Sequence, residues 1–162
     1  EEALRCCYEN SRDNARTPMQ WTDDENAGFT DGTPWLAMNP NYRQINVREQ
    51  EVRTDSVLAY YRRLVHLRKA DAYRETFTYG IFEPAYQEMA DVFAYYRVSG
   101  ESGQRILVAA NFGTDAVSLP LAYPCRQVLL SNLRAESAVE TACEKANALT
   151  LESCEVAVIE LG

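Results

Sequence analysis

The sequence predicts a mainly β protein, in which an antiparallel β-sandwich or barrel follows a long loop and one helix. Two observations predict this order. After residue 72, short runs rich in β-branched and aromatic residues alternate with turn residues at spacings of about 8 to 15. Before that point, residues 10–44 are rich in Pro, Gly, Asn and Asp, and a single helical pattern follows them. The chain has 162 residues, enough for one ordinary domain and part of another.

The expected strands lie in the second half of the chain. They are 77–82, 92–98, 105–112, 116–119, 126–130, 148–151 and 155–161. The alternation in 155–161 indicates a half-buried strand with Val156, Val158 and Leu161 on approximately one face. Residues 134–147 are compatible with either a loop or a short helix.

Residues 55–70 carry the clearest helical pattern. Thr54, Asp55 and Ser56 offer an N-cap, and one apolar stripe follows it, formed by Val57, Leu58, Tyr61, Leu64 and Val65. His66, the only histidine, lies inside this pattern, so we expect a helix-surface or packing role rather than a catalytic base. A short helix is also compatible with residues 1–9.

The loop over residues 10–44 contains both tryptophans, Trp21 and Trp35, among Asp, Asn and Arg residues. Aromatic rings stack on sugar CH groups and polar side chains bind hydroxyls, so this composition is compatible with a sugar-binding loop. The alternative is that the aromatic residues anchor the loop to a core. Residues 23–25 are three consecutive acids, which indicate an exposed turn rather than the converging carboxylate pair of a glycosidase.

Charge and cysteine content exclude several classes of protein. The net charge is −8, and residues 71–162 carry 13 acidic and 6 basic residues, so nucleic-acid binding is not expected. No apolar run reaches the length of a membrane span and no signal peptide is visible. The five cysteines show no metal-ligand spacing, so we expect reduced thiols, a cytoplasmic location and no metal site.

Three sequence motifs in the first half of the chain carry a specific family resemblance. SRDNARTPMQW (11–21), AGFTDGTPW (27–35) and NPNYRQINVREQ (39–50) occur in order before the helix over 55–70. Together they resemble the C-terminal part of the glycoside hydrolase family 13 α-glucosidases. This group includes oligo-1,6-glucosidases, dextran glucosidases, trehalose-6-phosphate hydrolases and sucrose isomerases. The resemblance is dense over residues 11–70 and looser over 71–162.

The resemblance implies two domains. Such enzymes have a catalytic (β/α)₈ barrel followed by a C-terminal β-sandwich. Residues 1–73 would then be the end of the barrel, a long loop plus the last helix, and residues 74–162 would be the sandwich. The upstream barrel would be the partner of the first region, and it would hold the oligosaccharide substrate on the face built by its loops.

The family's aspartate nucleophile, glutamate acid/base and second aspartate belong to earlier barrel strands, and none maps onto this sequence. The usual Ca²⁺ site also lies upstream, so no catalytic residue, metal or cofactor is expected here. The resemblance assigns a binding role to Arg16. Its guanidinium, with N–H donors in a fixed fork, would help to bind the non-reducing-end glucose. Arg12 and Asp13 are further candidates for shaping that pocket. For Arg16 the alternative is a salt bridge that only organises the loop.

The function implied is that of the C-terminal portion of a retaining, exo-acting α-glucosidase of the oligo-1,6-glucosidase type. The 162-residue chain alone would not hydrolyse α-glucosides, whereas the longer protein that contains it would. The alternative is a non-catalytic module that binds carbohydrate or stabilises the barrel. A third hypothesis, a relative of the heavy-chain subunits of amino-acid transporters, is disfavoured because those proteins depart from the RDNAR motif.

Overall fold

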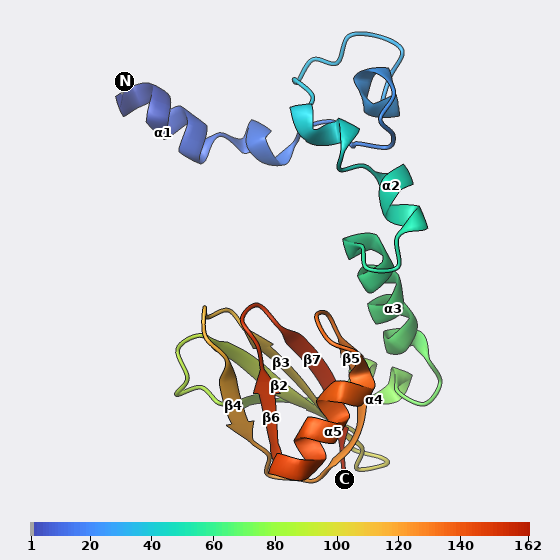
Figure 1. Cartoon of the computed structure of the whole chain (residues 1–162), viewed down its shortest axis with the longest axis vertical. Coiled ribbons are helices and arrows are strands. Elements are labelled where there is room, and N and C mark those ends of the chain that lie inside the picture. Colours follow the sequence, from blue (N-terminus) through green and yellow to red (C-terminus); the bar gives the residue numbers. More distant parts are fainter. Residues whose placement is uncertain (1) are drawn as a thin grey trace. The chain divides into compact units, whose positions relative to one another are not determined.

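The computed structural model describes residues 2–162, apart from the side chains of Asn14, Glu144 and Lys145. The chain divides into two compact units, the first ending at Tyr61 and the second covering Arg62–Gly162 (Figure 1). The domain boundary expected at residues 73 and 74 rests on the family resemblance and stays a prediction.

Short helical segments joined by irregular chain make up the first unit. They are α1 (Glu2–Asn10), η1 (Arg12–Ala15), η2 (Glu25–Gly28), η3 (Pro40–Arg43) and α2 (Val47–Val52), the three η segments being 3-10 turns. Asparagine side chains cap two of them: Asn39 Oδ1 accepts from the N–H of Asn41, and Asn46 Oδ1 accepts from that of Glu49. The irregular character predicted for residues 10–44 is therefore confirmed.

Two distant stretches of this unit are joined through Gln20. Its side-chain amide donates to Asn41 Oδ1 at 3.0 Å, and its carbonyl accepts from the N–H of Val47 at 2.9 Å. The Trp21 carbonyl accepts from the next N–H, that of Arg48, at 3.0 Å. The start of α2 is thus fixed against residues 20 and 21. Trp35, in contrast, is 93% exposed and does not anchor the loop within this chain.

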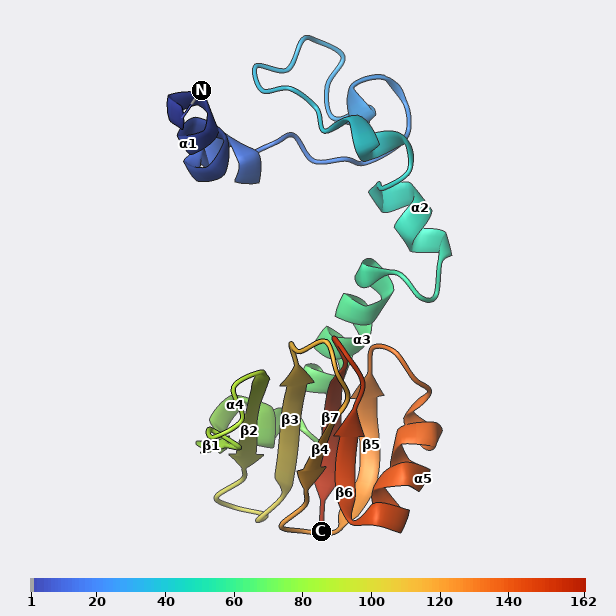
Figure 2. The same cartoon turned by 60° about the vertical axis from the view of Figure 1, so that its left-hand side comes forward.

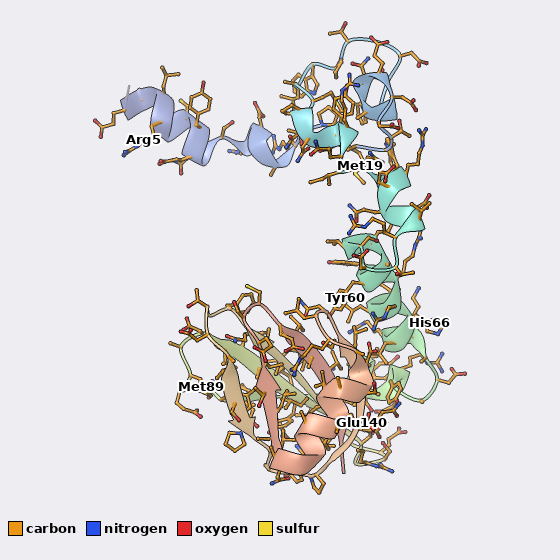
Figure 3. All side chains as sticks on the ribbon, in the orientation of Figure 1. Arg5, Met19, Tyr60, His66, Met89 and Glu140 are labelled. Atoms are coloured by element: carbon orange, nitrogen blue, oxygen red, sulfur yellow. The ribbon has the colours of Figure 1, made fainter. Side chains whose placement is uncertain are left out.

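Helix α3 (Val57–Lys69) confirms the helix predicted over 55–70. Ser56 starts it, because its hydroxyl accepts from the N–H of Ala59 at 3.1 Å and donates to the Gln50 carbonyl at 2.7 Å. Most of the apolar stripe of α3 is exposed, with Tyr61 as an example, whereas Leu58 is partly buried. His66 is also exposed on α3, as the surface role predicted for it requires (Figure 3).

Two antiparallel sheets form the rest of the second unit, after the short helix α4 (Arg74–Tyr79). The larger sheet has the order β1-β2-β3-β7-β5, and β4 and β6 pair separately (Figure 2). The strands are β1 (Ile81–Ala85), β2 (Val92–Val98), β3 (Arg105–Asn111), β4 (Val117–Pro120), β5 (Cys125–Ser131), β6 (Ala148–Leu151) and β7 (Val156–Leu161). Helix α5 (Glu136–Ala146) connects β5 to β6.

One hydrophobic core joins the two sheets and α5. Leu107 and Ile159 come from the larger sheet, Leu119 and Leu149 come from the smaller one, and Val139 comes from α5. All five side chains are almost fully buried, so the two sheets are packed through their side chains. A second contact fixes α5, since Glu140 Oε2 accepts from the N–H of Val128 on β5 at 3.0 Å.

Several expectations need correction. Residues 77–79 belong to α4 and not to a strand, so β1 begins only at Ile81. In β7, Leu161 faces the shared core together with Ala157 and Ile159, and not on one face with Val156 and Val158. Val158 is 2% exposed on the other face, where Val156 is only partly buried. Of the two possibilities left open for residues 134–147, the structure has the short helix, α5. The chain is therefore a mixture of helix and antiparallel sheet, and the mainly β character holds only after α4.

Among residues 2–162, no helix has the length and apolar character that a membrane span requires.

Candidate functional site

The candidate residues Arg12, Asp13 and Arg16 lie on or next to the 3-10 turn η1. Ser11 caps this turn, because its hydroxyl accepts from the N–H of Asp13 at 3.3 Å. The N–H of Arg16 then donates to the Asp13 carbonyl at 3.0 Å and closes the turn. The backbone of RDNAR is thus folded locally, and it brings the three candidate residues onto one short turn.

The side chains of these three residues are all exposed. Among the described side chains, none of the three takes part in an ion pair or a side-chain hydrogen bond. The loop-organising salt bridge considered for Arg16 is therefore not formed within the part of the chain that the structure describes. The assignment of these residues to glucose binding stays a prediction.

A second cluster organises the neighbouring loop. Arg48, on α2, donates from Nη1 to Asp23 Oδ1 at 2.9 Å and from Nη2 to Asp24 Oδ2 at 2.8 Å. A planar guanidinium suits this geometry, because its fork holds two carboxylates at once. Hydrogen bonds from the Thr22 hydroxyl and then from Arg48 lower the pKa of Asp24. Asp23 and Asp24 are exposed, as the predicted turn requires, and they are engaged with Arg48.

Sequence reasoning missed Arg48. Its partners lie 24 and 25 residues earlier, across irregular chain, so no periodic spacing connects them. The only signal in the sequence is the position of Arg48 two residues after the capping Asn46 in NVREQ, which does not specify a distant partner.

A hollow of about 250 Å³ lies directly after the η1 turn. Its walls are residues 17–20 on one side and Ile45, Asn46, Val47 and Gln50 on the other. Figure 3 labels Met19, one of the lining residues. The lining contains no acid, so this hollow offers amide and thioether groups rather than proton-transfer groups. Among the described residues, no group of three or more His, Cys, Asp or Glu side chains is arranged to hold a metal ion.

Comparisons with known proteins place the candidate site in a family. The catalytic domain of alpha-amylase matches residues 1–80, the part of the chain that contains η1, α2, α3 and α4. An oligo-1,6-glucosidase from Parageobacillus thermoglucosidasius is 38% identical over 144 residues, which cover 86% of this chain and 25% of that protein. This chain belongs to the alpha-amylase family.

Other members of the alpha-amylase family are similar over most of the chain. A glucan 1,6-alpha-glucosidase from Streptococcus pneumoniae is 40% identical over 80% of this chain and 23% of its own length. The crystal structure of isomaltulose synthase from Klebsiella sp. LX3 superposes with a TM-score of 0.79 and 34% identity, covering 94% of this chain and 26% of that one. The chain thus spans about a quarter of the length of these relatives.

Proposed function

We propose that this chain is the C-terminal portion of a retaining, exo-acting α-glucosidase of the oligo-1,6-glucosidase type, which hydrolyses α-glucosidic bonds of short oligosaccharides. The observation that carries the proposal is the 38–44% identity to proteins named oligo-1,6-glucosidase. On this proposal, the region up to residue 73 completes a (β/α)₈ barrel, and residues 74–162 form a C-terminal β-sandwich. The cytoplasm is the proposed location, since five cysteines without a disulfide-framework pattern in a chain of this length are typical of reduced, intracellular thiols.

Arg16 has the central role in this proposal. Its guanidinium carries five donors in a rigid fork, and no described side chain occupies them. A sugar hydroxyl and a carboxylate of the barrel are the partners that such a fork binds. Asp13 and Arg12, on the same turn, would shape the pocket around the glucose unit. The acid/base and the nucleophile would come from the barrel and not from this chain.

The proposal predicts a difference between the 162-residue chain and the longer protein that contains it. The chain alone is expected not to hydrolyse nitrophenyl α-glucoside, and the longer protein is expected to hydrolyse it with retention of configuration. Hydrolysis by the isolated chain would contradict the division of residues proposed here. Inactivity of the longer protein on every α-glucoside would contradict the function. Isomaltose and sucrose as competing substrates then distinguish hydrolases from isomerases.

One observation favours the second candidate function, a carbohydrate-binding module. Phe82, Tyr95 and Phe93 form an aromatic row on β1 and β2, with ring centroids 4.9 Å and 5.7 Å apart. Phe82 and Phe93 are half exposed, and exposed rings stack on sugar CH groups. Calorimetry of the chain with isomaltose and malto-oligosaccharides tests this function. Binding that is lost in Tyr95→Ala and kept in Tyr79→Ala, a change outside the row, would support it.

A further inference from the structure

Cys125 on β5 and Cys143 on α5 lie next to one another in the second unit. Cys143 is 1% exposed within the hydrophobic core, and Cys125 is partly buried and packs against the same cluster. Both thiols therefore border one hydrophobic cluster, at the contact of α5 with β5. The other three cysteines, Cys6, Cys7 and Cys154, are exposed.

The packing of α5 on β5 explains why these two residues meet. Glu140 accepts a hydrogen bond from the N–H of Val128 at 3.0 Å, so this turn of α5 is fixed against the middle of β5. Cys143 lies one helical turn after Val139 and Glu140, and it continues the buried stripe of α5. Cys125 lies at the start of β5, three residues before Val128. Helix α5 is thus held against β5, and Cys143 from the helix and Cys125 from the strand both border the shared cluster.

From this juxtaposition we infer that Cys125 and Cys143 are a modification site, at which a small-molecule disulfide such as oxidised glutathione converts the two thiols into one intramolecular disulfide. The bond would join α5 to β5, which already pack against the same hydrophobic cluster. No residue of the candidate glucose-binding turn takes part, so the inference is independent of the proposed function.

The order of the two exchange steps follows from exposure. Burial, and then the neighbouring Cys125, raise the pKa of Cys143 to about 12, which makes Cys143 a poor first nucleophile. Cys125 is the accessible thiol, so its sulfur attacks one sulfur of oxidised glutathione and releases one glutathione thiolate. The sulfur of Cys143 then attacks the Cys125 sulfur of the mixed disulfide, and the Cys143 proton passes to the glutathione thiolate that leaves. Two electrons pass from the cysteines to glutathione disulfide, which becomes two thiols.

The experiment is a titration of the 162-residue chain with oxidised glutathione, followed by alkylation, proteolysis and mass spectrometry. The expected result is a linked pair of peptides containing Cys125 and Cys143, lighter than the two separate peptides by two hydrogen atoms. Oxidation should also raise the melting temperature by about 5 °C or more, because the bond closes a loop in the unfolded chain. Cys154→Ser, the matched control, should leave both results unchanged.

Two outcomes would overturn the inference. One is that Cys143 remains a free thiol after oxidation is complete, so that it is alkylated, while glutathione is found only on exposed cysteines. The other is linkage of Cys125 to Cys6, Cys7 or Cys154 instead of Cys143. Because Cys143→Ser alters the core, Cys125→Ser serves as the second variant. It should abolish the linked peptides while leaving Cys143 without attached glutathione.

Discussion

Arg134 and Glu155 form an ion pair whose carboxylate is completely withdrawn from water. Arg134 Nη2 lies 2.7 Å from Glu155 Oε2, and its Nε donates to Glu155 Oε1 at 2.9 Å. Ser131 at the end of β5 and the N–H of Glu152 also donate to this carboxylate. The pair therefore ties the end of β5 to the turn that leads into β7.

Arg134→Ala is expected to destabilise the fold by about 3 kcal/mol, because it leaves the buried Glu155 charge without its counter-ion. Chemical denaturation of the chain measures the change. Arg126→Ala is the matched control, since Arg126 pairs with Glu160 at 3.5 Å from an exposed position. Arg126→Ala should lower the free energy of unfolding by no more than about 1 kcal/mol. Equal losses in the two variants would show that burial of the pair is energetically unimportant.

Stability is expected to depend on the ionisation of Glu155. Burial raises the pKa of this carboxyl, but hydrogen bonds from Arg134, the Glu152 N–H and Ser131 outweigh burial and lower it below 4.5. A carboxylate with a lowered folded pKa stabilises the fold above its unfolded pKa, and this contribution is lost as the pH falls through the folded pKa. Lowering the pH from about 7 to about 3 should therefore reduce the difference in free energy of unfolding between the wild type and Glu155→Gln. A constant difference across urea titrations would contradict the prediction.

Gly80→Ala is expected to destabilise the junction of α4 and β1 by about 1–3 kcal/mol. An added Cβ would lie 2.4 Å from the Thr76 carbonyl oxygen and 3.0 Å from that of Val98, and both are backbone atoms that cannot rotate away. Thermal unfolding measures the effect. Gly100→Ala is the control, because a Cβ added there would meet no heavy atom within 4 Å, and its melting temperature should stay close to that of the wild type.

In the longer protein, Arg16→Ala is expected to lower kcat/KM for an α-glucoside by about 100-fold, the size of effect seen when one fixed donor is removed from an active site. Arg16→Lys should recover only part of this loss, because an ammonium lacks the guanidinium fork. Arg5→Ala, on the exposed face of α1, should leave kcat/KM unchanged. Full activity of Arg16→Ala would remove Arg16 from the substrate-binding residues.

The local sequence pattern predicts a strand or helix correctly where the residues of that element determine its structure. The run 92–98 and the run 148–151 match β2 and β6 residue for residue. Residues 77–79 have the composition of a strand, because Phe, Thr and Tyr favour strands, yet they are helical. The reason is tertiary: the Thr76 hydroxyl bonds to Gln104, and Arg97 donates to the carbonyls of Thr76 and Phe77. Contacts from β2 and from the residue before β3 thus override local propensity.

Only part of the candidate site can be predicted from the sequence, for the same reason. The turn that carries Arg12, Asp13 and Arg16 is local, and the motif identifies it. The Arg48 contact with Asp23 and Asp24 joins residues separated by irregular chain, where no period exists to predict a partner.

The strand order has a consequence for synthesis on the ribosome. Strand β7 lies between β3 and β5, although 24 residues, 132–155, separate the end of β5 from the start of β7. When β5 leaves the exit tunnel, its place in the sheet does not yet exist, because its neighbour β7 has not yet emerged. Strands β1 to β3 can form a meander early, but the β5 edge must wait. Holdase chaperones that shield exposed edges should therefore engage the nascent chain in this interval.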